Sequence, residues 1–362
     1  MMGDLRPFQT IGIIGGGQLG RMLALAAARL GHKTIVLDPG KDCPAAQACN
    51  QHIIADYDDV EALLELQRCD IVTFEFENVD LDAIRTLEKT TRIAPSPRAL
   101  EISQDRLIEK QFLTDAGLKT AAFEDVTSAE QLDEALNKFG GKGILKTRRF
   151  GYDGKGQVAF KGTAGDPSPE KALEEIANAP AILEAFVPFA AEISVIITRD
   201  ADGQSTCFDP AQNKHVDGIL QTSTVPSGIA SDTIEDAKLH AKKLADALVY
   251  VGTLGLEFFV LPNGSLIANE FAPRVHNSGH WTEAACTISQ FEMHIRAITG
   301  WPLSTPVRHS DASMENLIGD SIARLQALAE DGDVVLHDYG KAQARSGRKM
   351  GHFTRITRKP GL

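Results

Sequence analysis

The stretch Glu257-Phe-Phe-Val-Leu-Pro-Asn-Gly-Ser-Leu-Ile-Ala-Asn-Glu270 constrains the fold most. Its Asn263-Gly264 pair is the strongest short hairpin signal a sequence can carry, because both residues tolerate positive φ. Glu257 and Glu270 are equidistant from a two-residue turn there, which would leave their Cβ atoms roughly 4.5–5.5 Å apart. Like charges so close destabilise a sheet unless a cation lies between them. Mg²⁺ suits such oxygen ligands, although an edge hairpin with solvated glutamates is the alternative.

Length and charge limit the classes of protein to which this chain can belong. Its 362 residues exceed what one hydrophobic core usually supports, so we expect two or three domains. A net charge of −12 argues against a nucleic-acid-binding protein as a whole. The segment from Tyr339 onward nevertheless lacks acidic residues and carries Lys341, Arg345, Arg348, Lys349, Arg355, Arg358 and Lys359. It is either a solubilising tail or part of an anion site.

Cysteine usage and apolar patterning favour a cytoplasmic protein. The five cysteines are scattered and never spaced as Cys-x-x-Cys, which is typical of reduced thiols rather than of disulfides or a zinc site. The N-terminus has no apolar signal core, and no run of about 18 apolar residues occurs. We therefore expect neither secretion nor a membrane partner.

A glycine-rich loop near the N-terminus predicts a βαβ unit. Ile11-Gly-Ile-Ile14 is typical of a buried strand, Gly15-Gly-Gly-Gln-Leu-Gly20 follows, and residues 19–30 form an alanine-rich helix. The glycines satisfy Gly-x-Gly-x-x-Gly, and Asp38 follows about 20 residues on. Alone, this fingerprint makes an NAD-dependent dehydrogenase the leading hypothesis. The same turn also serves other phosphates or simply packs a helix against a strand.

The alternation of strands and helices continues to about residue 100. We expect helices over residues 58–68 and 81–88, with a strand over residues 70–74 between them. Glu75 follows this strand at the carboxyl end of the sheet, where open parallel sheets bind ligands. It therefore points toward the same crevice as the glycine loop, where a carboxylate suits a ligand amine or hydroxyl. An exposed loop acid is the alternative. Ala94-Pro-Ser-Pro97 marks the following linker.

A strand lysine followed by a glycine-rich flap indicates phosphate binding in the middle of the chain. A helix over residues 104–116 carries Arg106, and a later strand over residues 143–147 carries Lys146. That strand runs into Arg148-Arg-Phe-Gly-Tyr-Asp-Gly-Lys-Gly-Gln157, which lacks the Gly-Lys-Ser/Thr ending of a Walker loop. A point charge beside a mobile cover of backbone N–H groups suits phosphates. A simple hairpin turn is the alternative.

Further polar positions lie between the flap and the glutamate hairpin. Residues 181–189 are typical of a strand and a hinge whose backbone could meet an adenine edge, and Glu192 in the next buried strand could reach a ribose. His215 belongs to the polar stretch Gln212-Asn-Lys-His-Val-Asp-Gly218. A lone histidine of this kind is more often a loop hydrogen-bond partner than a catalyst. A helix over residues 234–248 precedes the hairpin.

The order of these features resembles that of the ATP-grasp ligases: a strand lysine, a glycine flap, a hinge with a glutamate, and two opposed metal-ligand glutamates. From about residue 11 to 354 the chain is similar to the N5-carboxyaminoimidazole ribonucleotide synthase family. The motifs that carry this resemblance are Gly15-Gly-Gly-Gln-Leu-Gly-Arg-Met22, Thr73-Phe-Glu-Phe-Glu-Asn78, Gly151-Tyr-Asp-Gly-Lys-Gly-Gln157, Asn269-Glu-Phe-Ala-Pro-Arg-Val-His-Asn-Ser-Gly-His280 and Arg348-Lys-Met-Gly-His352. The run from Asn269 to His280 is the most specific of them.

The resemblance implies a fold of mixed α/β and α+β class in four parts. These are a Rossmann-like, biotin-carboxylase-like preATP-grasp domain (residues 1–100), an ATP-grasp small lobe with the flap (101–190), a large lobe with the metal site (191–305) and a small β-rich C-terminal subdomain packed on the large lobe (306–362). The implied reaction carboxylates 5-aminoimidazole ribonucleotide with ATP and bicarbonate, through carboxyphosphate, in purine biosynthesis. The family also implies Mg²⁺ or Mn²⁺ and a homodimer, without flavin, NAD, biotin, nucleic acid or membrane.

The resemblance further implies a role for each motif residue. Glu257 and Glu270 would ligate the metal ion. ATP would be held by Arg106, Lys146, Tyr152, Asp153, Gly154, Lys155, Gly156, Gln157, Glu184, Ala185, Phe186, Val187, Glu192 and Asn269. Bicarbonate or carboxyphosphate would lie against Arg274, His276, Asn277 and Tyr152. The aminoimidazole nucleotide would bind Gln18, Leu19, Glu75 and His215, with Lys341, Arg348 and Lys349 at its 5′-phosphate.

Two departures and several alternatives qualify this reading. Gln212 stands where the family often has glutamate, so any carboxylate role there is lost, and Phe150 stands where it often has glycine, which we expect to stiffen the flap.

A formate-dependent glycinamide ribonucleotide transformylase shares the architecture, but the Arg274-Val-His-Asn-Ser-Gly-His280 run favours the carboxylating family. A biotin carboxylase is usually longer. A dehydrogenase gives Glu257 and Glu270 no role, and a non-catalytic nucleotide-binding protein needs no metal pair.

Overall fold

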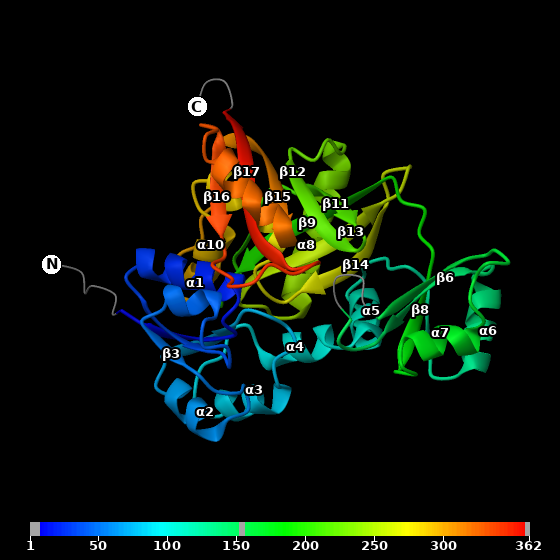
Figure 1. The fold of residues 1–362 in the computed structure, drawn as a ribbon, viewed down its shortest axis with the longest axis horizontal. Coiled ribbons are helices and arrows are strands. Elements are labelled where there is room, and N and C mark those ends of the chain that lie inside the picture. The colour runs from blue at the N-terminus through cyan, green and yellow to red at the C-terminus, as the bar shows by residue number, and fades with distance from the viewer. Residues whose placement is uncertain (1–7, 152–155, 359–362) are drawn as a thin grey trace.

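Three β-sheets and their helices make up residues 8–151 and 156–358, the parts of the chain that the computed structural model describes (Figure 1). A parallel sheet from the first hundred residues and a nine-stranded sheet from the second half of the chain lie against each other. The third sheet, from the middle of the chain, projects to one side. In these described ranges no helix combines the length and the apolar character needed to cross a membrane.

The N-terminal sheet is parallel and has the strand order β3-β2-β1-β4. Its elements are β1 (Thr10–Ile14), α1 (Gln18–Arg29), β2 (Lys33–Leu37), β3 (Gln51–Ile53), α2 (Val60–Leu66), β4 (Ile71–Phe74) and α3 (Leu81–Glu88). β1 and β4 are buried along almost their whole length, as expected at the centre of a sheet covered on both faces. The strand order reverses between them, so the loops that follow β1 and β4 meet in one crevice.

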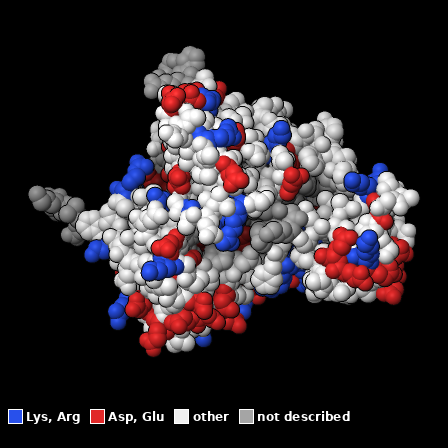
Figure 2. Space-filling model, in the orientation of Figure 1, with Lys and Arg blue, Asp and Glu red and all other residues white. Residues whose placement is uncertain are grey.

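The middle sheet is antiparallel and has the order β5-β8-β6-β7. Its elements are β5 (Phe123–Val126), α6 (Ala129–Lys138), β6 (Lys142–Thr147), β7 (Gln157–Lys161), α7 (Pro169–Glu175) and β8 (Ala181–Ala185). Leu145 of β6 joins the apolar cluster beneath the helices, so its neighbours Ile144 and Lys146 face the opposite side. Figure 2 shows acidic side chains gathered near α2 and α3 and near α6 and α7, at the two outer ends of the molecule.

The large sheet is antiparallel and has the order β14-β13-β9-β11-β12-β15-β17-β16, with β10 paired to β9. Its strands are β9 (Ala191–Arg199), β10 (Ser205–Cys207), β11 (Ala211–Val216), β12 (Ile219–Val225), β13 (Gly252–Val260), β14 (Leu266–Ala272), β15 (Ser310–Ile318), β16 (Val334–Asp338) and β17 (Lys349–Arg358). β15 pairs with β12. The β-rich C-terminal part therefore extends the large sheet through strand pairing, where we had expected it to pack on the large lobe.

Helices α8 (Ser231–Ala247) and α10 (Gln290–Thr299) cover opposite faces of the large sheet. The alternation of side chains along β9 separates the two cores, since Val195 packs with α8 whereas Ile196 packs beside Met293 of α10. The other side of α10 packs against α1, and every residue of α10 except Arg296 is buried. This helix therefore joins the N-terminal sheet to the large sheet.

The predicted hairpin forms, but the predicted two-residue turn is wrong. Leu261 N–H donates to Ser265 O (2.9 Å) and Gly264 N–H donates to Leu261 O (2.8 Å). Gly264 has φ of 82°, whereas Asn263 does not adopt positive φ. This is a three-residue loop, a type I turn followed by a left-handed glycine. Pro262 explains the difference, because its fixed φ suits the first central position of a type I turn.

The longer loop shifts the strand pairing next to the turn by one residue. A register irregularity between Leu256 and Phe258 corrects this shift, because beyond it Leu256 pairs with Phe271, as a two-residue turn would have required. Glu257 and Glu270 lie at this bulge. The two glutamates therefore come together by a different local geometry from the predicted one. β-bulges often re-aim side chains in this way beside active sites.

The predicted helices of the first half of the chain form, with bounds that agree with the prediction at one of them and differ by one or two residues at others. The helix over residues 81–88 is confirmed at both ends, whereas the one expected from residue 104 begins as α5 (Arg106–Asp115), because the Asp105 carboxylate caps it by accepting from Leu107 N–H (3.0 Å). The remaining short elements are η1 (Pro44–Gln47), α4 (Pro97–Ser103), η2 (Asn277–Gly279), α9 (Thr282–Ala285), η3 (Gly319–Arg324) and α11 (Leu325–Leu328). The domain limits near residues 100, 190 and 305 stay predictions.

A buried histidine links the N-terminal sheet to the large sheet. His294 Nδ1 accepts a hydrogen bond from Thr253 N–H (3.1 Å), so the ring proton of the neutral imidazole is on Nε2. Nε2 lies 3.0 Å from Thr73 Oγ1 of β4 and donates to it. Burial lowers the pKa of His294 to about 3, which keeps the ring neutral. All three residues have no exposed surface.

We expect Thr73→Val to lower the free energy of unfolding by about 1–3 kcal/mol, because it leaves the His294 Nε2–H group buried without an acceptor. Urea denaturation of Thr73→Val, His294→Leu and the double variant measures the coupling between the two side chains. The effect of Thr73→Val should be smaller in the His294→Leu background. Additive effects of the two substitutions would contradict the hydrogen bond.

Candidate active site

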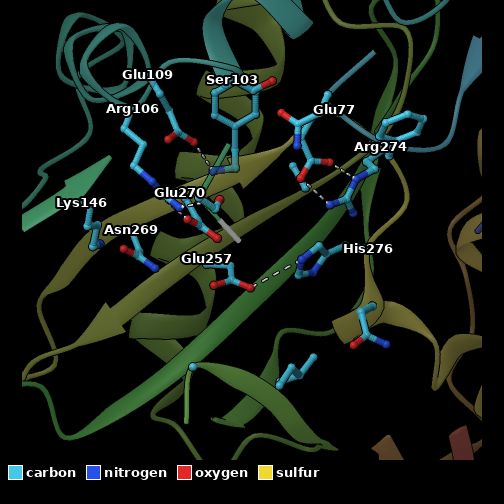
Figure 3. A pocket seen from close by; sticks show the side chains of 18 of the residues that line it. Glu77, Ser103, Arg106, Glu109, Lys146, Glu257, Asn269, Glu270, Arg274 and His276 are labelled. Atoms are coloured by element: carbon cyan, nitrogen blue, oxygen red, sulfur yellow. Dashed lines mark hydrogen bonds and ion pairs between the residues drawn. The ribbon is translucent and has the colours of Figure 1, made fainter. Parts of the chain in front are cut away.

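A cavity of about 590 Å³ opens where the three sheets approach one another (Figure 3). Its wall combines β13 and β14 of the large sheet, β6 of the middle sheet, the start of α5 and the loop after β4. Fifteen of the residues proposed from the sequence line it: Gln18, Leu19, Glu75, Arg106, Lys146, Gln157, Glu192, His215, Glu257, Asn269, Glu270, Arg274, His276, Asn277 and Lys349. Segments from distant parts of the chain thus converge on one space.

Glu257 and Glu270 bring two carboxylates together on one wall of this cavity (Figure 3). Burial and the charge of Glu270 raise the pKa of Glu257. Burial also opposes the ionisation of Glu270, but Arg106 Nη1 donates to Glu270 Oε2 (2.8 Å) and the net effect lowers its pKa. Asn269 Oδ1 is buried and has no partner among the described residues. Two carboxylates, one of them paired with a single arginine, and a neutral amide oxygen suit a hard divalent cation such as Mg²⁺.

Buried lysines supply positive charge beside the carboxylates. Glu184 of β8 forms ion pairs with Lys110 (3.1 Å) and Lys146 (3.0 Å). Burial opposes its ionisation, but Lys146 and then Lys110 outweigh this effect and lower its pKa to about 2. Lys110 also donates to Asn269 O (2.6 Å). The Glu184 side chain therefore anchors Lys146 at the cavity wall.

Arg274 faces the cavity from the opposite side and is held by Glu77 (Figure 3). Both Nε and Nη2 of Arg274 donate to the Glu77 carboxylate, the latter over 3.0 Å, and Nη1 donates to Val275 O (3.2 Å). Burial works against ionisation of Glu77, but Arg274 outweighs it and lowers the pKa of Glu77. The guanidinium orientation is fixed by this two-point contact, which leaves its charge partly compensated.

The neighbouring His276 is a neutral hydrogen-bond donor. Its Nδ1 lies 2.8 Å from Ser278 Oγ and also accepts from Ser278 N–H (3.4 Å), while Ser194 Oγ donates to Ser278 Oγ (2.7 Å). This chain makes Nδ1 an acceptor, so Nε2 carries the proton and points toward Glu257 Oε1 (3.6 Å). Burial and Arg274 lower the pKa of His276 to about 3. At neutral pH the ring therefore donates a hydrogen bond without carrying charge.

Asn277 is oriented by a C-terminal strand. Its side-chain amide exchanges two hydrogen bonds with that of Asn316 on β15, over 3.0 Å and 2.7 Å. Asn316 also donates to Leu220 O (2.9 Å). Asn316 of β15 thus orients Asn277, which lines the cavity, although Asn316 itself does not line it.

A second cavity of about 490 Å³ adjoins the first beside the glycine loop. Gln18, Glu75 and Phe76 line both cavities, whereas Lys341 and Arg348 line the second one. Lys341 Nζ donates to Lys349 O (2.7 Å) and Arg348 Nη1 donates to Gln343 O (3.0 Å). The basic C-terminal segment is therefore ordered here over its described residues, and the interpretation as a solubilising tail is wrong for this part of it.

Carboxylates of the chain itself occupy the N–H groups of the glycine loop. Glu75 accepts from Gly17 N–H (2.7 Å) and Gly20 N–H (2.9 Å), and Asp38 accepts from Gly16 N–H (2.7 Å). A Cβ on Gly17 would lie 2.4 Å from Glu75 Oε1, so the contact requires glycine. In a dinucleotide-binding protein these N–H groups face the pyrophosphate. Their use by Glu75 and Asp38 argues against the dehydrogenase alternative.

Some of the proposed site residues lie away from the first cavity or outside the described ranges. Gly156 and the hinge residues Glu184, Ala185, Phe186 and Val187 do not line either cavity. Glu192 and His215 both line the first cavity and pair with each other, Oε2 to Nδ1 over 3.0 Å. Tyr152, Asp153, Gly154 and Lys155 lie outside the described residues. The individual roles stay predictions.

Sequence reasoning missed three supporting residues. Glu109 lines the cavity and accepts from Phe271 N–H (2.8 Å), and burial and then Glu270 raise its pKa. Its position three residues after Arg106 on one helix was a usable signal, because such residues share a helix face. Glu77 belongs to the Thr73–Asn78 motif, but its pairing with Arg274 is visible only in the three-dimensional fold. Nothing in the sequence indicated Asn316.

Models of known families match three successive parts of the chain. These are the ribonucleotide synthetase preATP-grasp domain over residues 8–104, the ATP-grasp domain over residues 111–291 and the phosphoribosylaminoimidazole carboxylase C-terminal domain over residues 312–360. An N5-carboxyaminoimidazole ribonucleotide synthase from Brucella melitensis is 58% identical over 354 residues, which cover 98% of each chain.

Solved structures agree with this assignment. An N5-carboxyaminoimidazole synthetase from Staphylococcus aureus complexed with ADP has a TM-score of 0.93 and 38% identity, covering 98% of this chain and 95% of that one. An N5-carboxyaminoimidazole synthase from Aspergillus clavatus in complex with ADP and 5-aminoimidazole ribonucleotide has a TM-score of 0.90 and 28% identity, covering 97% and 94%. The chain belongs to the N5-carboxyaminoimidazole ribonucleotide synthase family of ATP-grasp enzymes, which make that product from ATP, bicarbonate and 5-aminoimidazole ribonucleotide in purine biosynthesis.

Proposed function

We propose that the chain carries out the family reaction in the first cavity, as a cytoplasmic homodimer, with Mg²⁺ held by Glu257 and Glu270. The observation that carries this proposal is the meeting of excess negative charge at these glutamates with the cations Arg106, Lys146 and Arg274 in one space. ATP phosphates with their metal ion need both kinds of charge.

The metal fit rests on the oxygens at the bulge. Glu257, Glu270 and the unpartnered Oδ1 of Asn269 provide the hard ligands that Mg²⁺ prefers, and Mn²⁺ accepts the same set. When bound, the ion would neutralise charge on the transferring phosphoryl group. The protein itself holds the two carboxylates close together. Because burial and the charge of Glu270 raise the pKa of Glu257, this carboxylate either takes up a proton or binds a cation.

We assign binding of the ATP phosphates to Arg106 and Lys146. Glu184 fixes the Lys146 ammonium, while Arg106 is shared between Glu270 and Gly151 O (3.3 Å) at the start of the flap. We assign the backbone of residues 184–187 to adenine, Glu192 to the ribose and the flap to the phosphates. Together these groups would orient the γ-phosphoryl toward the side of the cavity that carries Arg274.

Bicarbonate activation falls to Arg274, His276 and Asn277. A bicarbonate oxygen attacks the γ-phosphorus, ADP leaves, and the carbon gains phosphate as a leaving group in carboxyphosphate. The guanidinium of Arg274 and the Nε2–H of His276 would stabilise the anionic oxygens without moving a proton. The amine of the aminoimidazole then attacks the carboxyl carbon of carboxyphosphate, or the CO₂ released from it; the C–O bond to phosphate breaks, and the departing phosphate takes up the amine proton. Charge neutralisation is therefore the main work of these side chains.

The ribonucleotide fits the junction of the two cavities. Gln18 and Glu75 line both, so the aminoimidazole can lie beside them with its amine facing Arg274 and His276. Its 5′-phosphate would then extend into the second cavity toward Lys341 and Arg348, with Lys349 at the boundary. This placement is supported by the convergence of the basic C-terminal segment and the glycine loop.

The first test is the release of ADP from ATP. We expect release only when bicarbonate and 5-aminoimidazole ribonucleotide are both present, because the acceptor amine consumes the activated carboxyl group. Assays with formate and glycinamide ribonucleotide serve as the control for the related transformylase. ADP formation at the same rate with and without bicarbonate and the aminoimidazole nucleotide would refute the proposed carboxylation reaction.

A second prediction concerns the metal ligand. Glu270→Gln should lower kcat by roughly 10²–10³-fold or more, since it removes a charge that acts on the transition state. Glu315→Gln is the matched control, because Glu315 belongs to the same sheet and lies outside both cavities. Far-ultraviolet circular dichroism verifies the fold of both variants. Unimpaired Mg²⁺-dependent turnover in Glu270→Gln would show that the ligand assignment is wrong.

A third prediction concerns the basic C-terminal segment. Arg348→Ala should raise the KM for the ribonucleotide about 10- to 100-fold, the value of a hydrogen bond to a charged group, and leave the KM for ATP nearly unchanged. Arg345→Ala is the control from the same loop, because Arg345 is exposed and lines neither cavity. Equal effects of Arg348→Ala on the two substrates would place the 5′-phosphate elsewhere.

A further inference from the structure

One buried glutamine lies at the junction of α4 and α5, on the wall of the first cavity. Gln104 is the C-cap of α4 and immediately precedes Asp105, the N-cap of α5. It is 7% exposed and lines the first cavity. A side-chain amide at such a depth normally has hydrogen-bond partners, so the partners of Gln104 show what the amide holds in place.

The amide of Gln104 joins three segments of the chain. Its Nε2 donates to two main-chain carbonyl groups, Glu77 O and Val79 O, both over 2.8 Å. Its Oε1 accepts from Arg149 Nη2 (2.8 Å). Because a guanidinium only donates and a carbonyl only accepts, these contacts determine which end of the amide faces which partner. The nitrogen therefore faces the loop between β4 and α3, and the oxygen faces the segment that follows β6.

The loop between β4 and α3 needs these donors. Residues 75–80 belong to neither a helix nor a strand, so their carbonyl groups cannot be satisfied by a regular ladder. Val79 is buried in the same apolar cluster as Leu100 of α4, where water has little access to replace a lost donor. The two hydrogen bonds from Gln104 therefore set the position of the loop backbone.

The Glu77 side chain transmits this position to Arg274. Its carboxylate accepts from both Nε and Nη2 of Arg274, and dashed lines mark these contacts in Figure 3. The carbonyl of Glu77 is thus held by Gln104 while its carboxylate holds the guanidinium. A two-point contact fixes direction as well as position, because both planar groups must stay aligned. A displacement of the Glu77 backbone would therefore turn or withdraw the guanidinium in the cavity.

We propose that Gln104 is a positioning residue for the bicarbonate subsite, acting through Glu77 on Arg274. This inference rests on the proposed function, which assigns bicarbonate to Arg274. Stabilisation of an anion by a guanidinium depends on a prearranged geometry, and a misplacement of about 1 Å can cost roughly 100-fold in rate. Gln104 therefore contributes to the reaction without touching the substrates.

The ribonucleotide side of the same loop has its own anchors. Glu75 N–H donates to Ile14 O (3.0 Å), and the Glu75 carboxylate accepts from Gly17 N–H and Gly20 N–H. Loss of the Gln104 amide should therefore affect bicarbonate more than the ribonucleotide. This selectivity distinguishes a positioning role from a general contribution to folding, which would impair the use of all three substrates.

The test compares Gln104→Met and Gln104→Glu with the wild-type chain in degassed buffer at varied bicarbonate. Met keeps the length of the side chain and removes all three hydrogen bonds, whereas Glu keeps the acceptor for Arg149 and removes the two donations to the loop. We expect each variant to raise the KM for bicarbonate about 10- to 100-fold and to leave the KM for ATP and for the ribonucleotide nearly unchanged. Gln111→Met is the matched control, because Gln111 is exposed on α5 and lines neither cavity.

A double-mutant cycle tests the route through Glu77. Gln104→Met should add little to the effect of Glu77→Gln on kcat/KM for bicarbonate, because both substitutions act through Arg274. Additive effects would overturn this route. Circular dichroism verifies the fold of each variant, and Gln104→Glu carries the test if Gln104→Met does not fold.

The same assays separate this inference from the proposed function. An unchanged KM for bicarbonate in a folded Gln104 variant, or equal rises in the KM of all three substrates, would overturn the positioning role while wild-type turnover persists. Wild-type ADP release that does not depend on bicarbonate would instead refute the proposed function.

Discussion

Two carboxylates at a bulge in the β13–β14 hairpin concentrate negative charge that the surrounding elements must balance. Arg106 reaches Glu270 from the first turn of α5, and the Glu184 pairs hold Lys110 and Lys146 close by from α5 and β6. These contacts tie the middle sheet and α5 to the large sheet. Among the described residues Glu257 has no such ion pair with a lysine or arginine, and its pKa is raised by burial and by the charge of Glu270. The positions of the charged side chains in the first cavity follow from this distribution of positive charge.

A single short loop after β4 organises the other side of the cavity. Its alternating acids face different ways: Glu75 holds the glycine loop through Gly17 and Gly20, and Glu77 holds Arg274. The proposed positions of the ribonucleotide and of the carboxyl donor are therefore set by residues only two apart in the chain. Because His294 joins the strand before this loop, β4, to Thr253 of the large sheet, the loop has little freedom to move relative to the β13–β14 hairpin.

The sequence could predict most elements and many of the residues that line the first cavity, because hydrophobic periodicity and the family motifs are local signals. Pro262 favours the three-residue turn, so the wrong turn came from giving Asn263-Gly264 too much weight, whereas the bulge at Glu257 that corrects the register could not be predicted. The sequence predicted that Glu75 and the glycine loop share a crevice. It could not predict that the Glu75 carboxylate would accept hydrogen bonds from Gly17 and Gly20, because these contacts depend on the pairing of β1 with β4. Pairings such as Asn277 with Asn316 likewise depend on the assembled sheet.

The joining of β15 to β12 has a consequence for how the chain folds during synthesis. Strands β9, β13 and β14, which carry Glu192, Glu257 and Glu270, are complete by residue 272, but β12 then still presents an open edge. That edge closes only when residues 310–318 pair with it and residues 349–358 pair in turn with β15. Open edges attract other chains. The last fifty residues therefore act as a cover for the nascent sheet, and a chain truncated before them would expose an aggregation-prone strand.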